Sequence, residues 1–311
     1  MPTTPHPDII PDYREHPGLM AILSRYASLI DETVNFGSRV FTWVFETTNK
    51  GDHHIAAISF YRRSLELLDS IGALIRTSSI APSRVLLRSL FEALCSFEYM
   101  TESDLENRGR DYILCLKHRE IDYARKLKKD DALHADYAGK LRRDSLLMNM
   151  PIPDIPNLSE AIAAKERLIN SPFYESSEAS FQTIRQRSGR NPKWWFNLHD
   201  GPRDICDLAE KVGRPGQYEM MYRNWAGYAH GTGGMDEQVE IVARTTVAIP
   251  QLRSPADAEF ITLIALSYGL SMINAMVRLY APDKVPIVAQ WYKEELQVGY
   301  LDLSVKRIHV T

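Results

Sequence analysis

Residues 19–34 read LMAILSRYASLIDETV, and the apolar positions in this stretch recur at intervals of three and four. Such spacing places the apolar side chains on one face of an α-helix. The pattern returns over residues 60–75, where only Ser64 interrupts the apolar stripe, and again over residues 85–97. Successive amphipathic helices bury their apolar faces most simply against one another. The sequence therefore predicts an all-α protein built as a multi-helix bundle.

The stretch MPIPDIP at residues 150–156 interrupts the helical pattern. Proline lacks a backbone amide hydrogen and disfavours the helical conformation in the residue before it, so a helix cannot continue through this stretch. We expect an extended connector here, with later helices that include residues 217–230 and a long apolar helix over 254–282. Residues 17–311 are predicted to form a single helical domain, preceded by a flexible N-terminal arm at residues 1–16.

Two segments near the C-terminus depart from helical spacing. Residues 239–244 and 301–306 alternate apolar and polar side chains, and this period of two is typical of β-strands. An isolated strand leaves its backbone hydrogen-bonding groups without partners. We therefore expect the two segments to pair with each other as a small two-stranded antiparallel β-ribbon near the C-terminus.

The composition is that of an ordinary globular protein, with 311 residues, 44% hydrophobic residues and a formal net charge of −3. The three cysteines, Cys95, Cys115 and Cys206, form no CxxC pair, which favours a reducing compartment. The N-terminal residues lack the basic and apolar regions of a secretion signal. We therefore expect a cytoplasmic protein. The negative net charge removes any argument from overall electrostatic attraction to nucleic acid.

Residues 260–277 contain no charged side chain, and the stretch is long enough to cross a bilayer. It nevertheless includes the polar residues Thr262, Ser267, Ser271 and Asn274. A central helix surrounded by other helices has the same composition. We therefore expect a core helix and no association with a membrane.

Several common sites are set aside because their motifs are missing from the sequence. It has no GxxxxGKS or GxxxxGKT phosphate loop, no GxSxG nucleophile elbow and no ExxH pair of the kind that di-iron bundles require. Asp131 and His134 have a spacing similar to ExxH, but we do not expect them to bind a metal. His199 and Asp200 follow two tryptophans, and we interpret Asp200 as a helix N-cap. We expect neither a metal nor a cofactor.

The stretch YRNWAGYAH at residues 222–230 carries the strongest candidate site. Residues seven apart on an α-helix differ by about 700° of rotation, so Arg223 and His230 would share one face, about 10 Å apart along the axis. A long arginine side chain can cover much of that distance toward a bound phosphate. His230 lies at the expected C-terminal end of its helix, where the partial negative charge favours the imidazolium form.

An arginine, then a polar residue, and a histidine after four to six intervening residues form the signature of HEPN ribonucleases, and Arg223, Asn224 and His230 resemble it. The resemblance implies a small helical bundle, commonly a homodimer, whose paired motifs cleave RNA without a metal ion. Such proteins act in toxin, phage-defence and RNA-processing systems. The resemblance therefore implies RNA, and an antitoxin or defence partner protein, as partners.

A second resemblance covers roughly residues 55–235 and is to a bacterial family of unknown function. It rests on positions that are spread over several predicted helices. These positions are the run RSLFE at 88–92, a tryptophan near Trp194 and Trp195, and Tyr218, Tyr222 and His230. That family usually has serine or threonine where this chain has Ala226 or Gly227. The difference leaves the role of the turn before His230 open.

The implied chemistry is cleavage of RNA by its own 2′-hydroxyl, which attacks the adjacent phosphate. A group that titrates near neutrality must take that proton and supply one to the leaving oxygen, and His230 is suited to both tasks. Arg223 would pair with the phosphate oxygens and stabilise the charge of the transition state, and Asn224 would hold a phosphate or the imidazole. The predicted supporting residues are Arg88, Glu92, Tyr222 and Tyr228.

Two other interpretations remain open. Arg88 and Glu92, one helical turn apart, have the spacing of an ordinary intrahelical ion pair. Arg223 could be a surface residue, and His230 a hydrogen-bonded residue at a helix end, in a non-catalytic interaction or sensor module of a bacterial defence or regulatory system. An enzyme should bring the two together in a basic, partly exposed cleft. A module should hold them apart or engage them with carboxylates.

Overall fold

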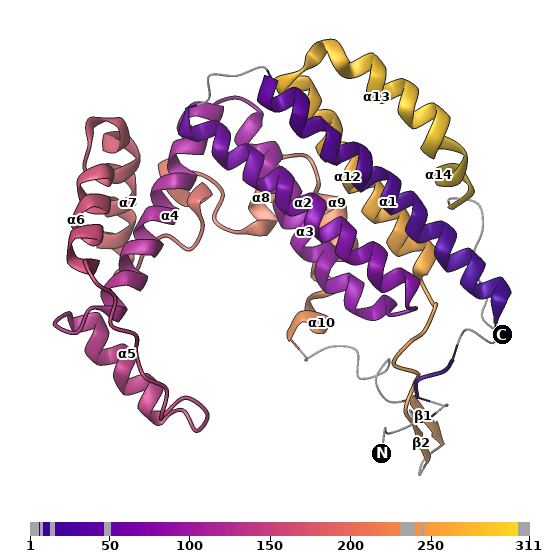
Figure 1. Cartoon of the computed structure of the whole chain (residues 1–311), viewed down its shortest axis with the longest axis horizontal. Helices are drawn as coiled ribbons and strands as arrows, with labels where there is room; N and C mark the ends of the chain where they lie inside the picture. Colours follow the sequence, from indigo (N-terminus) through magenta and orange to yellow (C-terminus); the bar gives the residue numbers. More distant parts are fainter. Residues whose placement is uncertain are drawn as a thin grey trace. The chain divides into compact units, whose positions relative to one another are not determined.

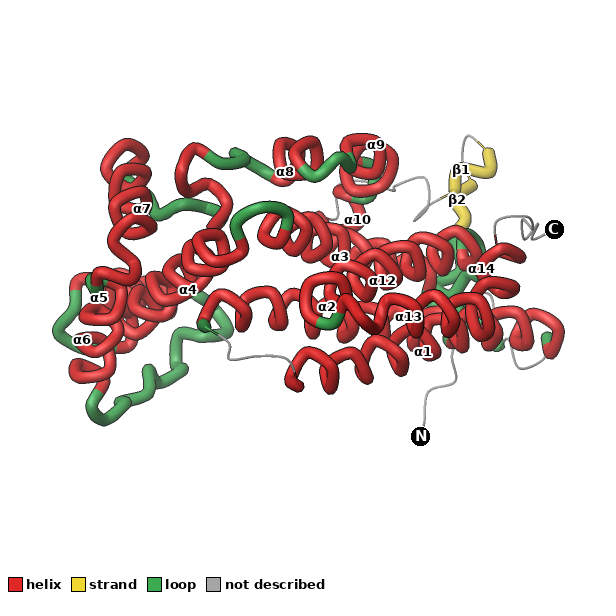
Figure 2. The backbone as a smooth tube through the Cα atoms, turned by 90° about the horizontal axis from the view of Figure 1, so that it is seen from above, coloured by secondary structure: helices red, strands yellow, loops and turns green. Residues whose placement is uncertain are grey.

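The computed structural model describes residues 6, 9–12, 16–46, 51–230, 240–243 and 246–303. The chain divides into two compact units, of which unit 1 comprises residues 1–49, 57–102 and 208–311 and unit 2 comprises residues 50–56 and 103–207. Helices dominate both units, which confirms the predicted all-α class (Figures 1 and 2). The predicted single domain stays a prediction, because two compact units need not fold independently. Most of the predicted N-terminal arm at 1–16 lies outside the described residues.

Four long helices build most of unit 1. They are α1 (Pro17–Glu46), α2 (Asp52–Arg76), α3 (Ile80–Thr101) and α12 (Ala258–Tyr280). The predicted apolar stripes form the core, because Leu23 and Ile30 of α1 and Leu68 and Ile71 of α2 have no exposed surface. α12 packs against both α1 and α3 although it comes much later in the sequence (Figure 1). The core of unit 1 therefore joins the beginning of the chain to its last third.

α12 is the one helix in the described part of the chain that is long and apolar enough to cross a membrane. This is weak evidence for insertion, since the core helix of a soluble protein passes the same test. Within its most apolar window, 56% of the residues are buried in the protein. Gly269 permits the close packing, because a Cβ there would lie 2.9 Å from Cδ1 of Leu68 and 3.0 Å from Cγ2 of Thr33. α12 thus packs as the core helix that its composition predicts.

Shorter helical elements complete unit 1. They are α8 (Ile205–Lys211), whose first three residues belong to unit 2, α9 (Pro215–Gln217), the π-helical turn η4 (Tyr218–Arg223), α10 (Ala226–His230), η5 (Pro282–Lys284), α13 (Val285–Trp291), the π-helical turn η6 (Tyr292–Leu296) and α14 (Gln297–Leu303). The indole of Trp291 stacks on the ring of Phe36, with 3.9 Å between centroids, and donates a hydrogen bond of 2.8 Å to Glu32. These contacts attach α13 to α1.

The predicted β-ribbon between residues 239–244 and 301–306 is not seen. Residues 301–303 belong to α14, and residues 304–306 lie outside the described residues. β1 (Glu240–Ala243) instead pairs antiparallel with β2 (Thr246–Ala248), with Glu240 opposite Ala248. A partner that follows closely in sequence costs less loop-closure entropy than one some sixty residues later. Alternation over so few residues does not distinguish a strand from a short helix.

Unit 2 is helical as well. Its elements are α4 (Leu105–Leu127), α5 (Ala132–Arg143), α6 (Leu158–Ile169), η2 (Pro172–Tyr174), α7 (Glu175–Ser188) and η3 (Trp195–Asp200). α4 packs against α5, α6, α7 and η3, and the core includes Tyr174 and Phe181, which are 0% and 1% exposed. Residues 151–155, where the connector is predicted, have no regular structure and lie inside unit 2.

The first turn of α2 belongs to unit 2 and lies directly against α4. A Cβ at Gly109 would lie 2.6 Å from the Cβ of His53 and 2.7 Å from its Cα. Atoms of the main chain cannot move aside as the end of a flexible side chain can. Only glycine therefore allows α4 to pass so close to His53.

Candidate functional site

Helix α3 carries charged side chains on its buried side. Arg84 and Arg88 are 8% and 9% exposed, and Glu92 and Glu98 are half-buried. At 100° per residue, these four positions fall within about 120° of one another around the helix axis. A buried charge is costly unless it is paired and hydrogen-bonded. The partners come from residues 214–228 and from the start of α12.

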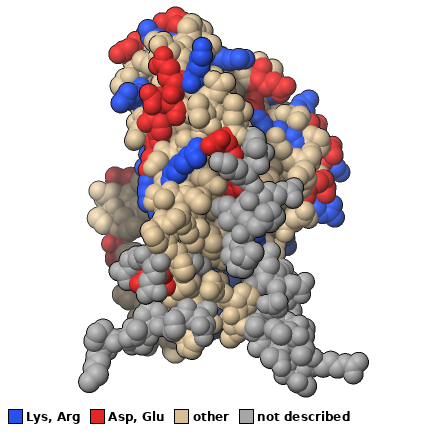
Figure 3. Space-filling view, turned by 90° about the vertical axis from the view of Figure 1, so that its right-hand side faces the viewer, with Lys and Arg blue, Asp and Glu red and all other residues tan. Residues whose placement is uncertain are grey.

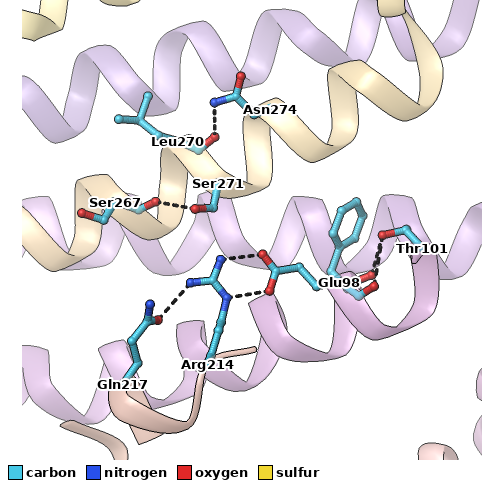
Figure 4. A network of polar contacts seen from close by, with 9 residues as sticks. Glu98, Thr101, Arg214, Gln217, Ser267, Leu270, Ser271 and Asn274 are labelled. Carbon is cyan, nitrogen blue, oxygen red and sulfur yellow. Dashed lines mark hydrogen bonds and ion pairs between the residues drawn. The ribbon is translucent and has the colours of Figure 1, made fainter. Parts of the chain in front are cut away.

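The first contact joins Glu98 to Arg214, just before α9 (Figure 4). The guanidinium donates two hydrogen bonds of 2.6 Å to the two carboxylate oxygens, and a third of 3.0 Å to the side chain of Gln217. Burial works to lower the pKa of Arg214, but the hydrogen bonds and charge of Glu98 outweigh it and raise the pKa. Ser271 and Asn274 of α12, also drawn, donate to carbonyls of their own helix. The bidentate pair therefore fixes the start of the segment to α3.

The second contact is made by Tyr222 in η4. Its hydroxyl donates a hydrogen bond of 2.6 Å to Glu92. Arg88 donates to the carbonyl of Tyr222 and lies over its ring, with 3.9 Å between Cζ and the ring centroid. Burial, and then Glu92, raise the pKa of Tyr222, so its hydroxyl stays protonated as a donor. Arg88 and Glu92 thus both contact Tyr222, and their predicted role in supporting a catalytic site stays a prediction.

The third contact holds α10 and the start of α12. Arg84 donates to the hydroxyl of Tyr228 and lies over its ring, 4.6 Å from the centroid. The same guanidinium donates a hydrogen bond of 2.6 Å to Asp257, the residue before α12. Asp257 has a φ of 64°, in the left-handed region that few residues other than glycine adopt. One arginine of α3 therefore joins two separate parts of the chain.

Arg223 and Asn224 lie on the exposed side of this segment. The side chain of Arg223 is 68% exposed and forms an ion pair of 3.1 Å with Glu219, four residues earlier. The amide of Asn224 donates a hydrogen bond of 3.1 Å to the carbonyl of Met220. Arg223 is thus accessible to solvent but already faces a carboxylate.

The predicted continuous helix over 217–230 is wrong. Tyr218–Arg223 forms a π-helical turn, residues 224 and 225 form a hydrogen-bonded turn, and α10 follows as Ala226–His230. The physical reason is tertiary, because Tyr222 is held by α3 and local helix preference is a weak constraint. A rotation of 100° per residue therefore does not apply from Arg223 to His230. The side chain of His230 lies outside the described residues, so its predicted proximity to Arg223 stays a prediction.

Sequence reasoning missed four residues of this arrangement. They are Arg84, Glu98, Arg214 and Asp257. The signal available in the sequence was the presence of charged residues on the helix face that also carries the apolar core positions of α3. Their partners could not be identified, because the pairs join residues 116 to 173 positions apart.

The arrangement determines which groups are free to act. Arg84, Arg88 and Arg214 are engaged within the protein, whereas an anion can reach the exposed guanidinium of Arg223 without breaking a buried pair. Among the side chains that the structure describes, no group of three or more His, Cys, Asp or Glu residues is placed to hold a metal ion.

Comparison with known proteins places this arrangement in a family. No curated protein and no solved structure matches the chain. A family model described as a family of unknown function (DUF5677) matches residues 54–240, which include α3 and the segment from Arg214 to Tyr228. The matched region agrees with the predicted resemblance to a family of unknown function over roughly residues 55–235. Since the match covers more than half of the sequence, the chain belongs to the DUF5677 family.

Proposed function

We propose that the chain is a HEPN-like, metal-independent endoribonuclease whose site is built on residues 222–230. One observation carries the proposal. Tyr222 and Tyr228, which flank Arg223 and Asn224, are held by buried and half-buried side chains of α3, while Arg223 between them stays exposed. Catalysis by positioned groups requires a rigid support beneath accessible side chains. The contacts with α3 supply that support.

The proposed reaction needs no group beyond this segment and the RNA. The 2′-oxygen attacks the adjacent phosphorus, the bond from phosphorus to the 5′-oxygen breaks, and a 2′,3′-cyclic phosphate and a 5′-hydroxyl result. His230 takes the proton of the 2′-hydroxyl and supplies one to the 5′-oxygen. Arg223 pairs with the phosphate oxygens, and Asn224 holds a phosphate or the imidazole.

The proposal includes a cellular setting. We place the protein in the cytoplasm as a homodimer, with RNA as its substrate and an antitoxin or defence partner that controls a toxin or phage-defence activity. On the face drawn in Figure 3, Lys and Arg are interspersed with Asp and Glu. Such a surface favours binding of RNA through a few local phosphate contacts and does not favour binding through a broad basic patch. A second copy in the dimer would double the number of such contacts at the paired motifs.

The test is cleavage of mixed RNAs by the purified protein in EDTA. We expect products with a 2′,3′-cyclic phosphate, and His230→Ala should abolish them. Arg223→Gln should lower the rate about 100-fold to 1000-fold, as expected for loss of a group that stabilises transition-state charge. Arg62→Gln is the matched control, because Arg62 is 70% exposed and pairs with Glu66 four residues away. Cleavage that persists unchanged in His230→Ala would contradict the proposed mechanism.

A second candidate function is a non-catalytic interaction or sensor module of a bacterial defence or regulatory system. The ion pair of 3.1 Å between Arg223 and Glu219 favours it, because a module is expected to engage its arginine with a carboxylate. An exposed pair of this kind contributes about 0–1 kcal/mol, so a phosphate could displace Glu219. Glu219→Gln distinguishes the two functions. An enzyme should keep or increase its cleavage, whereas the absence of cleavage in both wild type and Glu219→Gln would support the module.

A further inference from the structure

Unit 2 contains a cavity of about 210 Å³ that takes no part in the proposed ribonuclease site. α4, α6 and α7 supply most of its lining. Its walls combine charged side chains with the buried apolar side chains of Ile121 and Ile169, which are 3% and 4% exposed. Small-molecule sites are concave and use polar groups to orient the ligand. This cavity is more polar than most such sites, because eight of its ten lining residues are polar or charged.

His118 and Glu178 form a hydrogen-bonded pair in the lining. Nε2 of the imidazole lies 2.7 Å from the carboxylate, and the two side chains are 8% and 15% exposed. The ring of Phe181 stacks on the imidazole, with 3.7 Å between centroids and 6° between planes. The other carboxylate oxygen accepts a hydrogen bond of 2.6 Å from Gln182. Glu178 is therefore satisfied within the protein, and the imidazole is held in one orientation.

Arg125 and Glu166 form an ion pair in the lining. Beside these two pairs, the cavity has two further charged residues, Asp122 and Arg185. Asp122 accepts a hydrogen bond of 2.7 Å from the neutral amide of Asn191, and this contact leaves its negative charge in place. The guanidinium of Arg185 makes no hydrogen bond or ion pair with the residues that the structure describes, and it acts on Glu178 through space. The cavity thus offers one positive and one negative group to a ligand.

We propose that this cavity binds a small zwitterion of the α-amino acid type with an aliphatic side chain. The carboxylate of the ligand pairs with Arg185, since a guanidinium matches a carboxylate with two parallel hydrogen bonds. The ammonium group pairs with Asp122. The aliphatic side chain packs against Ile121 and Ile169. A ligand with a net charge would leave either Asp122 or Arg185 unpaired, so the zwitterion fits best.

The proposal is tested by calorimetric titration of the full-length protein with L-leucine, L-isoleucine and L-methionine. The analogue 3-methylbutylamine lacks the carboxylate of leucine, and 4-methylpentanoate lacks its ammonium group. We expect at least one of the amino acids to bind and both analogues of leucine to bind at least tenfold more weakly than leucine. Failure of all three amino acids to bind would overturn the proposal. Equal binding of leucine and 4-methylpentanoate would also overturn it, because the site would then select an anion only.

Variants assign the binding to this cavity. Arg185→Gln and Asp122→Asn should each weaken amino acid binding at least tenfold. Arg187→Gln, which removes an exposed arginine from the same helix, and Asp130→Asn should leave it unchanged. Arg185 is exposed, so its substitution tests the site even if Asp122→Asn disturbs folding. Unchanged affinity in Arg185→Gln would place the binding elsewhere and overturn the assignment.

Discussion

Helices α3 and α4 both bury charged side chains, but they find their partners at different distances along the sequence. Glu98 and Arg84 of α3 bind Arg214 and Tyr228, which lie 116 and 144 residues away. On α4, His118 binds Glu178 at a separation of 60 residues, and Arg125 binds Glu166 at a separation of 41. α3 uses its charges to hold one irregular segment, whereas α4 keeps a cavity beside them. The same residue types thus support a motif in unit 1 and surround an open space in unit 2.

The largest expected effect comes from breaking the pair that most firmly attaches the segment to α3. Arg214→Ala leaves Glu98 without its partner, and the two side chains are only 16% and 24% exposed. We expect a loss of about 2–3 kcal/mol in the free energy of unfolding, below the 3–5 kcal/mol of a fully buried pair. Urea denaturation measures it. Arg203→Ala is the control, because Arg203 is 84% exposed and its pair with Asp207 should contribute about 0–1 kcal/mol. Equal losses in the two variants would mean that the pair does not anchor the segment.

A substitution at Gly109 tests how much the close packing of α4 against His53 contributes to the stability of unit 2. Gly109→Ala places a Cβ 2.6 Å from the Cβ of His53, and the resulting displacement of α4 should cost about 1–3 kcal/mol. Gly139→Ala in α5 is the matched control, because a Cβ there meets nothing within 4 Å. That control should gain up to about 1 kcal/mol from better helix propensity. Thermal and urea unfolding distinguish the two, and a stabilising Gly109→Ala would show that the close approach to His53 is not required.

The smallest expected effect is a pH dependence of stability that comes from Glu178, the partner of His118 on α4. Burial works to raise the pKa of Glu178, but the hydrogen bonds from His118 and Gln182 outweigh it and lower the pKa below its ordinary value. Glu178 therefore contributes stability at pH values above the ordinary glutamate pKa of about 4.3, and this contribution is lost as the pH falls through the lower folded-state pKa. Glu178→Gln should lose about 1 kcal/mol or less at neutral pH and show a weaker acid dependence of the urea midpoint. Glu175→Gln, an exposed residue on the same helix, should keep the acid dependence of the wild type.

The sequence predicts what depends on neighbouring residues and misses what depends on distant ones. The apolar spacing of residues 19–34 predicts α1 correctly, because a helix is formed by residues three and four apart. The strand at 240–243 is also predicted, but its predicted partner at 301–306 is wrong, because alternation indicates a strand and does not identify the segment that pairs with it. The π-helical turn before Asn224 has the same origin, since a contact with α3 across 130 residues holds Tyr222.

The residues of the candidate site also divide into those that the sequence identifies and those that it misses. Resemblance to known families identified Arg88, Glu92 and Tyr222, and the structure brings these three side chains together. Arg84 and Arg214 carry no local signal beyond their charge, and their roles depend on Tyr228 and Glu98. Sequence reasoning therefore identified the segment that carries the motif but not the pairs that hold it.

The discontinuity of unit 1 has a consequence for synthesis of the protein. Residues 103–207, which belong to unit 2, are translated after α3 and before its partners. Ribosomes add about 5–20 residues per second, so the 116 residues that separate Glu98 from Arg214 take about 6–23 s to appear. During this interval the charged side chains of α3 lack the partners that they have in the folded protein. A chain released before Arg214 would leave α3 permanently incomplete, which makes it a natural substrate for chaperones and proteases.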